Sequence, residues 1–326
     1  MTTYDAKHIP AHAVRGTLDS ELARFLVSAP RLGAHEPVHV QRVAHDRLIP
    51  KTLPPIGRVE HLGLPGPHGT VPVRCFHPSK AGPADGGALI YLHGGGWTVG
   101  TLDQFEAPMR IFAERSGAQV YAVDYKLAPE YQWPVQIDEG EFVVRWLAEH
   151  GPERGVNPAR IALGGDSAGG NMTCVIALKL RDEDGPELAF QMPLYPETAL
   201  PFDTKSGVEN RTGYYLETAG VLLFAWNVIP QGADYSQPYI TPLNAKDLTR
   251  LPRTLLVTNG FDPLRDVGHA YAQKLAAAGN DITYINHEDL THGFIQFTEH
   301  SRRCLEATEE LAQHLGDALR KTSQKP

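Results

Sequence analysis

The chain has 326 residues, enough for one large α/β domain or two small ones, and its apolar share of 42% suits a globular protein. Its formal net charge of −8 argues against a nucleic-acid partner, because binding phosphates requires an excess of Lys and Arg. Cys75, Cys174 and Cys304 are too few and too widely spaced for a disulfide framework or a zinc site, so we expect reduced thiols and no metal.

From the first residues of the sequence we expect no signal peptide. Residues 1–8 lack the basic start and the apolar stretch of a signal peptide. The longest apolar runs, such as 221–226, are far too short to cross a bilayer. We therefore expect a cytoplasmic protein without stable membrane insertion.

The N-terminal stretch predicts one helix followed by irregular chain. Apolar residues at i, i+3 and i+4 from Leu22 predict an amphipathic helix over 18–27, which Asp19 or Ser20 can cap. Residues 28–56 are rich in Pro and His, and we expect them to be irregular.

The main part of the chain begins with a hairpin and continues with alternating strands and helices. Alternating residues over 58–62 and 70–76 predict the hairpin. Further on, short apolar runs alternate with helical stretches, which is typical of a mostly parallel sheet covered by helices on both faces. Ligands bind such sheets at the carboxyl ends of the strands. The expected strands are 88–92, 119–123, 160–163, 254–257 and 282–285, and the expected helices are 104–116, 135–149, 168–182, 265–278 and 302–320.

One stretch, 198–240, interrupts this alternation. It is rich in aromatic residues and contains no obvious core strand. Our interpretation is an inserted helical cap, joined by an N-terminal cap segment over 1–50, on an α/β domain over 51–326. An ordinary long connection is the alternative. The aromatic residues are Phe202, Tyr214, Tyr215, Phe224, Trp226, Tyr235 and Tyr239.

A single G-x-S-x-G motif, G-D-S-A-G at 165–169, lies between an expected strand and an expected helix. A sharp strand-to-helix turn strains the central serine, and only small residues on either side let the strand and helix approach so closely. The unpaired N–H groups and the dipole at the start of the helix stabilise negative charge beside that serine. We therefore predict Ser167 as a catalytic nucleophile.

A glycine-rich loop, H-G-G-G-W at 93–97, follows the expected strand 88–92. Acyl transfer needs backbone N–H donors aimed at a developing oxyanion, and glycines let the backbone approach the substrate. We predict an oxyanion hole formed by the N–H groups of Gly94, Gly95 and Ala168, with His93 bracing the loop. A simple glycine turn or a phosphate cradle is the alternative, although the G-K-[ST] ending of a phosphate loop is missing.

A serine hydroxyl needs an adjacent base, and in this type of fold the chain order is Ser, then Asp or Glu, then His. Asp262 follows the expected strand 254–257, and His292 follows 282–285. We predict that His292 accepts the Ser167 proton and that Asp262 orients the imidazole. The alternatives that remain open are Asp266 or Asp289 as the acid and His287 as the base.

These motifs, in this order, resemble the hormone-sensitive-lipase-like branch of bacterial esterases in its G-D-S-A-G subgroup. The resemblance runs over roughly 60–320 and rests on residues 93–97, 124–130, 165–171, 195–196, 262–266 and 292–294. It implies the α/β-hydrolase fold with a helical cap, and hydrolysis of short- to medium-chain acyl esters through an acyl-enzyme. It also implies no metal or organic cofactor, and often a homodimer formed through the last sheet strand.

The substrate pocket is the least specific part of this prediction. We expect Trp97, Tyr195, Phe294 and the aromatic residues of the cap to line it, with plain packing between cap and core as the alternative. The machinery also suits an amidase or a lactone hydrolase, because it is built for a tetrahedral intermediate and not for one leaving group. A receptor on the same scaffold, resembling the plant gibberellin receptors, would lack the histidine that is present here as His292.

Overall fold

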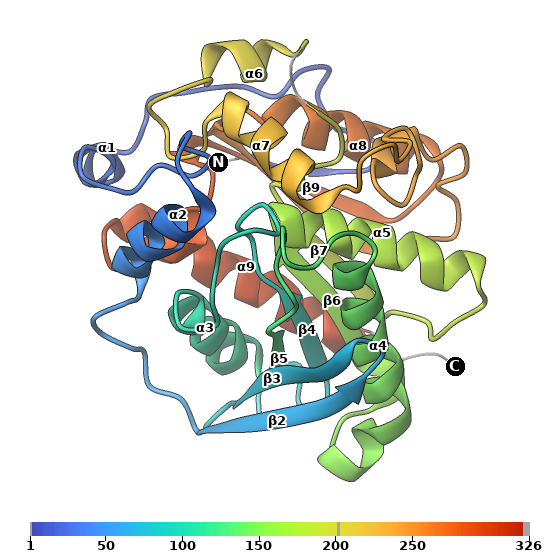
Figure 1. Ribbon diagram of the computed structural model, residues 1–326. Helices are drawn as coiled ribbons and strands as arrows, with labels where there is room; N and C mark the ends of the chain where they lie inside the picture. Colours follow the sequence, from blue (N-terminus) through green and yellow to red (C-terminus); the bar gives the residue numbers. More distant parts are fainter. Residues whose placement is uncertain (1, 201–202, 322–326) are drawn as a thin grey trace.

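The computed structural model describes residues 2–200 and 203–321. Within these residues, nine strands form one sheet in the order β1-β9-β8-β7-β6-β4-β5-β3-β2 (Figure 1). Strands β4 to β9 run parallel to one another, whereas β1, β3 and β2 are antiparallel additions at the two edges. The strands are β1 (Thr2–Asp5), β2 (Arg58–Gly66), β3 (Gly69–His77), β4 (Ala88–Leu92), β5 (Gln119–Val123), β6 (Ile161–Asp166), β7 (Phe190–Leu194), β8 (Thr254–Phe261) and β9 (Ile282–Thr291).

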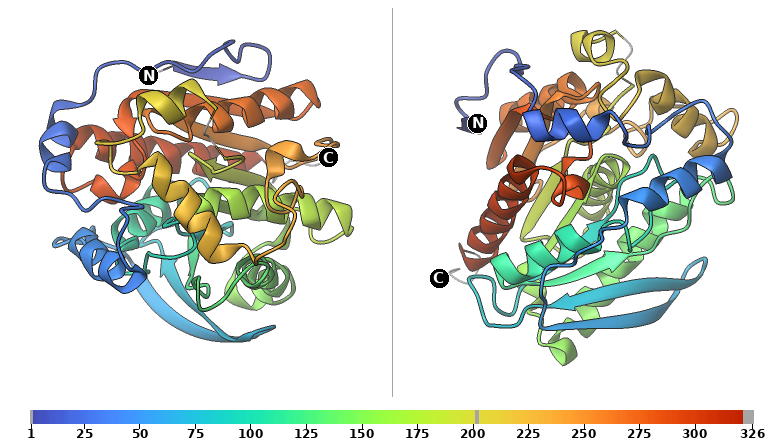
Figure 2. Two further views of the ribbon diagram at one scale, coloured as in Figure 1. Left: turned by 45° about the horizontal axis from the view of Figure 1, so that its top comes forward. Right: turned by 90° about the vertical axis from the view of Figure 1, so that its left-hand side faces the viewer.

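Helices cover both faces of the sheet, as expected for a mostly parallel sheet (Figure 2). The side chains of β4 show why: Leu89 and Tyr91 join the core under α3 and α9, while Ile90 and Leu92 point to the opposite core under α4, α5 and α8. The helices are α1 (Ser20–Leu26), α2 (Val38–His45), α3 (Glu106–Ser116), α4 (Val135–His150), α5 (Ala168–Asp182), α6 (Lys205–Glu209), α7 (Thr218–Val228), α8 (Arg265–Ala277) and α9 (Arg302–Lys321).

Three elements differ from the sequence-based expectation. Helix α2 lies in the stretch 28–56 that we expected to be irregular. It is short and is held by tertiary contacts, since Gln41 and His45 are buried. Strand β7 was not predicted, because Pro193 and a buried glutamine interrupt its apolar run. Strand β1 is mostly exposed, and its register comes from pairing with β9, so the strand had no local signal.

The predicted helix near residue 20 is present as α1, and its cap is Asp19, whose carboxylate accepts a hydrogen bond from the backbone N–H of Leu22. The hairpin of β2 and β3 is present and is longer than expected. None of the described helices is long and apolar enough to cross a bilayer.

Two segments far apart in the sequence lie together over the ends of β4 and β6 (Figures 1 and 2). The N-terminal segment pairs with the chain before α7 at Leu32 and Leu216. The backbones of Gly33 and Gly220 meet so closely that a Cβ on Gly220 would lie 2.3 Å from the Cα of Gly33. Glycine at both positions therefore allows the two segments to touch.

Candidate active site

Ser167 stands at the sharp turn between β6 and α5, with φ of 57° and ψ of −117°. This positive φ is a strained conformation for a residue with a side chain. The neighbouring glycine explains how the turn is possible, because a Cβ on Gly169 would lie 1.8 Å from the carbonyl oxygen of Leu92. The predicted steric requirement for small residues around Ser167 is thus present in the structure.

The loops after β8 and β9 bring a carboxylate and an imidazole to this serine. The Oγ of Ser167 lies 2.8 Å from Nε2 of His292, and Nδ1 of His292 lies 2.8 Å from Oδ2 of Asp262. All three side chains are buried. A hydroxyl donating to an imidazole, which in turn donates to a carboxylate, is the arrangement of a serine hydrolase.

The alternative acids and the alternative base have other partners. Asp266 accepts hydrogen bonds from Arg265 and from the backbone of Ser206. Asp289 pairs with Arg303, which also donates to Nδ1 of His287. Burial and the charge of Arg303 lower the pKa of His287 to about 3. None of these side chains enters the hydrogen-bonded chain that ends at Ser167.

The oxyanion loop requires one correction. The N–H of Gly94 donates to Oδ1 of Asp166 at 2.8 Å, so it is not free to bind an oxyanion. Within residues 2–200 and 203–321, no hydrogen bond engages the N–H groups of Gly95, Gly96 or Ala168. Gly96 therefore replaces Gly94 in the set of candidate donors. The loop motif was found in the sequence, but which of its glycines faces the serine depends on the backbone turn, where Gly95 and Gly96 both have positive φ.

Asp166 is a residue whose role the sequence did not predict. It is buried, and its Oδ1 accepts hydrogen bonds from both the Gly94 N–H and the Tyr91 hydroxyl, the latter at 3.0 Å. The carboxylate thus ties the oxyanion loop to the turn that carries Ser167. Burial raises the pKa of Asp166 to about 6, although its hydrogen bonds and the nearby His292 act in the opposite direction.

We expect replacement of Asp166 by Asn to reduce the pH dependence of stability. A native pKa raised to about 6 means that the native state binds the proton more tightly than the unfolded state. The free energy of unfolding then falls by up to ~3 kcal/mol as the pH rises through this window. The amide in the variant does not titrate, so urea unfolding of Asp166→Asn from about pH 4 to about pH 7 should show a smaller fall.

An Ala variant separates this titration from positioning. Asn keeps an oxygen that can accept from Gly94, whereas Asp166→Ala leaves that buried N–H without an acceptor. Turnover should therefore fall much more in Asp166→Ala than in Asp166→Asn. Equal losses in the two variants would contradict a positioning role for the carboxylate.

A small pocket adjoins Ser167, and Trp97 is among the residues that line it. Tyr195 and Phe294 are not among the residues that line this pocket or the neighbouring one, so their place in the substrate pocket stays a prediction. Both rings are buried behind the site: Tyr195 packs edge-on against His292 at 4.9 Å and against Phe294 at 5.5 Å. Tyr195 therefore packs against the imidazole of the triad.

Some of the aromatic residues expected in the cap line the pockets near Ser167, and one is exposed at the protein surface. Phe224 of α7 lies on the oxyanion loop, since a Cβ on Gly96 would be 2.2 Å from its ring. Tyr235 and Tyr239 line a second cavity next to the first, while Trp226 is exposed. Phe202 lies outside the described residues.

The N-terminal segment also reaches the oxyanion loop, which the sequence did not indicate. Arg42 of α2 donates to the carbonyl oxygen of Thr98 at 2.9 Å and to that of Ala128 at 3.0 Å. Both nitrogens at the end of its guanidinium also bind the carboxylate of Glu130. This bidentate pair holds α2 against the back of the loop.

Comparison with known proteins agrees with the site. A family model described as the alpha/beta hydrolase fold matches residues 89–296. The carboxylic ester hydrolase LipN of Mycobacterium tuberculosis is 36% identical over 279 residues, which are 82% of this chain and 73% of LipN. Esterase LipI of the same organism is 33% identical over 294 residues, 89% of this chain and 92% of LipI.

Solved structures give the same result. A hyperthermophilic esterase from the archaeon Pyrobaculum calidifontis matches with a TM-score of 0.85 at 30% identity, covering 94% of this chain and 99% of that one. The chain therefore belongs to the hormone-sensitive-lipase-like branch of the α/β-hydrolase fold family of carboxylic ester hydrolases.

Proposed function

We propose that this carboxylic ester hydrolase cleaves short- to medium-chain acyl esters through an acyl-enzyme on Ser167. The Oγ of Ser167 attacks the ester carbonyl carbon while Nε2 of His292 takes its proton. The bond from the carbonyl carbon to the leaving oxygen then breaks, and His292 returns the proton to the departing alcohol. Water, activated by the same imidazole, attacks the acyl-enzyme, releases the acid and restores Ser167.

The continuous chain of two 2.8 Å contacts from Ser167 through His292 to Asp262 carries this proposal. Asp262 keeps the proton of the imidazole on Nδ1, which leaves Nε2 free to act as the base, and it stabilises the imidazolium that forms. The N–H groups of Gly95, Gly96 and Ala168 supply the oxyanion donors. Such donors are worth ~3 kcal/mol or more each, because they are fixed in place before charge develops.

The lining of two neighbouring pockets supports the proposed range of acyl lengths. The pocket at Ser167 and a second pocket share Trp97 and Glu197 in their linings, and residues of α7 line both. Val221 of α7 lines both, so added methylene groups meet an apolar wall. Small apolar pockets of this kind, covered by a helix, suit a short or medium acyl chain better than a long one.

A panel of para-nitrophenyl esters from acetate to palmitate tests this range. We expect kcat/KM to rise by up to about fourfold per added methylene between acetate and hexanoate, since burying one contributes ~0.8 kcal/mol. For longer acyl chains kcat/KM should decrease, and it should be lower for palmitate than for hexanoate. A continuous rise through palmitate would contradict the proposal, and faster cleavage of the matching anilide would indicate an amidase.

We further propose that segments 1–50 and 198–240 together act as the cap over this site. The contacts of Leu32 with Leu216 and of Phe224 with Gly96 support this role. A cytoplasmic location is supported by three free, buried cysteines. For a homodimer, the strand available at this side of the sheet is β1, because β1 pairs with β9 and so covers the last strand of the parallel series.

A further inference from the structure

Glu197 lies where the two cavities of the site meet. It lines both the space at Ser167 and the larger space beyond, together with Trp97 and Val221. Its backbone N–H is 3.3 Å from the carbonyl oxygen of Ser167, and both residues line the pocket beside the nucleophile. The hydrogen-bonded chain from Ser167 to Asp262 does not include it.

The carboxyl of Glu197 is fixed by a neutral amide. Oε2 accepts a hydrogen bond from Nδ2 of Asn171 at 3.1 Å, and the same Nδ2 also donates to the carbonyl oxygens of Glu197 and Ile240. Among the described residues that line the two cavities there is no Lys or Arg. Within residues 2–200 and 203–321 no cation pairs with this carboxyl, and burial raises its pKa to about 7.

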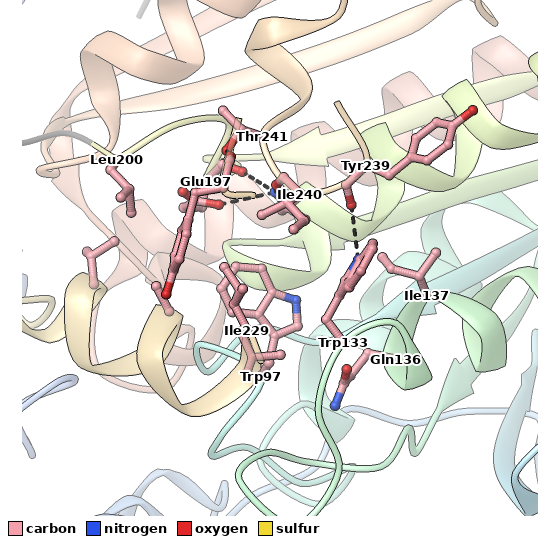
Figure 3. A pocket seen from close by; sticks show the side chains of 15 residues that line it. Trp97, Trp133, Gln136, Ile137, Glu197, Leu200, Ile229, Tyr239, Ile240 and Thr241 are labelled. Carbon is pink, nitrogen blue, oxygen red and sulfur yellow. Dashed lines mark hydrogen bonds between the residues drawn. The ribbon is translucent and has the colours of Figure 1, made fainter. Parts of the chain in front are cut away.

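The rest of the larger cavity offers aromatic faces and a second acceptor. The indoles of Trp97 and Trp133 stand in the middle of the lining residues (Figure 3). Oε1 of Gln136 is buried without a hydrogen-bond partner, while Nε2 of the same side chain donates to two backbone carbonyls. In Figure 3 the oxygen of Gln136 points toward Trp133 and its nitrogen points away.

These features match one kind of ligand group. Carboxylate and amide oxygens both attract a positively charged group, and indole faces attract ammonium ions through their ring electrons. A buried carboxylate without a cation is costly, and a bound ammonium removes this cost. A neutral alkyl group of the same shape gains only the apolar contacts.

We propose that the larger cavity receives a cationic ammonium group carried on one arm of the ester, with Glu197 as the residue that selects it. This inference rests on the proposed function, because the ester carbonyl must lie at Ser167 while the cation occupies the adjoining space. Glu197 is a specificity-determining residue here and takes no part in bond breaking.

Two matched substrates test the inference. One is the para-nitrophenyl ester of trimethylammoniobutyrate, and the other is its neutral isostere, in which carbon replaces the nitrogen. At a pH above the titration of Glu197, we expect wild-type enzyme to favour the charged ester, and the ratio of the two kcat/KM values to fall at least about tenfold in Glu197→Gln. Gln keeps an oxygen for Asn171, so the cavity wall retains its hydrogen bond.

The control is Glu183→Gln, which removes a surface carboxylate that pairs with Arg145 and Lys179, and it should leave the ratio unchanged. Inhibition of the wild-type enzyme by choline and by its neutral carbon isostere gives a readout that needs no variant, and choline should bind more tightly. A preference for the neutral compounds, or a ratio that Glu197→Gln does not change, would overturn the inference. Failure to hydrolyse either ester would instead overturn the proposed function.

Discussion

Replacing Ser167 by Ala is expected to lower kcat for a para-nitrophenyl ester by at least about 10⁴-fold. The variant keeps the oxyanion donors and the cavity, so substrate still binds, but the covalent path through Oγ is lost. Steady-state turnover of purified wild-type and variant enzyme on para-nitrophenyl butyrate measures the effect. The thermal midpoint should change little, because the substitution removes one hydroxyl and no packing group.

Covalent labelling gives a second readout for the same residue. A reactive organophosphonate ester should add one phosphonyl group to the wild-type protein, at Ser167, and none to Ser167→Ala, as measured by intact-protein mass and peptide mapping. Phosphonylation of another serine together with retained turnover in the Ala variant would place the nucleophile elsewhere.

Asp262→Asn is expected to have the second largest effect, a loss of about 10⁴-fold in kcat. An amide can donate its N–H to Nδ1 of His292 and so favour the wrong tautomer, which leaves Nε2 protonated and unable to accept from Ser167. Oδ1 of Asp262 also accepts from the backbone N–H of Leu264 at 2.8 Å, and Asn can keep that contact. The fold should therefore survive the substitution.

Asp266→Asn is the matched control, four residues further along the same segment. Its carboxylate binds Arg265 and the backbone N–H of Ser206, at the start of α8 and away from the imidazole. We expect thermal stability to fall and kcat to stay within about tenfold of wild type. The opposite ranking of the two variants would make Asp266 the acid.

The sheet and the triad were predictable because their signals are local and ordered. Short apolar runs separated by helical stretches gave the parallel strands β4, β5, β6, β8 and β9, each near its observed position. Ser167, Asp262 and His292 follow three of these strands. Since parallel strands bring their carboxyl ends to one edge, residues at those ends were expected to meet there.

The elements that were missed depend on partners far away in the chain. Strand β1 takes its register from β9, and α2 is held by contacts such as those of Arg42 with Thr98 and Ala128. Neither pattern is visible in a window of neighbouring residues. Strand β7 was missed because its proline and glutamine break the apolar pattern. Its burial on both faces of the sheet depends on tertiary packing and not on neighbouring residues.

The oxyanion loop shows what a glycine motif can and cannot predict about backbone hydrogen bonds. Three glycines in a row predict a backbone that can approach a substrate, but they do not say which N–H group is already engaged. Asp166, the second residue of G-D-S-A-G, takes the N–H of Gly94 and shifts the free donors one position along the loop. If the G-D-S-A-G and H-G-G-G-W motifs are considered together, a hydrogen bond between the Asp166 carboxylate and an amide of the glycine loop can be expected.

The contacts of the N-terminal segment with later parts of the chain affect the order in which the protein folds. Leu32 pairs with Leu216, and Thr2–Asp5 pairs with β9, more than 270 residues further along the chain. Contacts between residues so distant in sequence form slowly, and they cannot form before the later residue has left the ribosome. Residues 2–5 and Leu32 are thus expected to reach their native places late in folding, although they are synthesised before their partners.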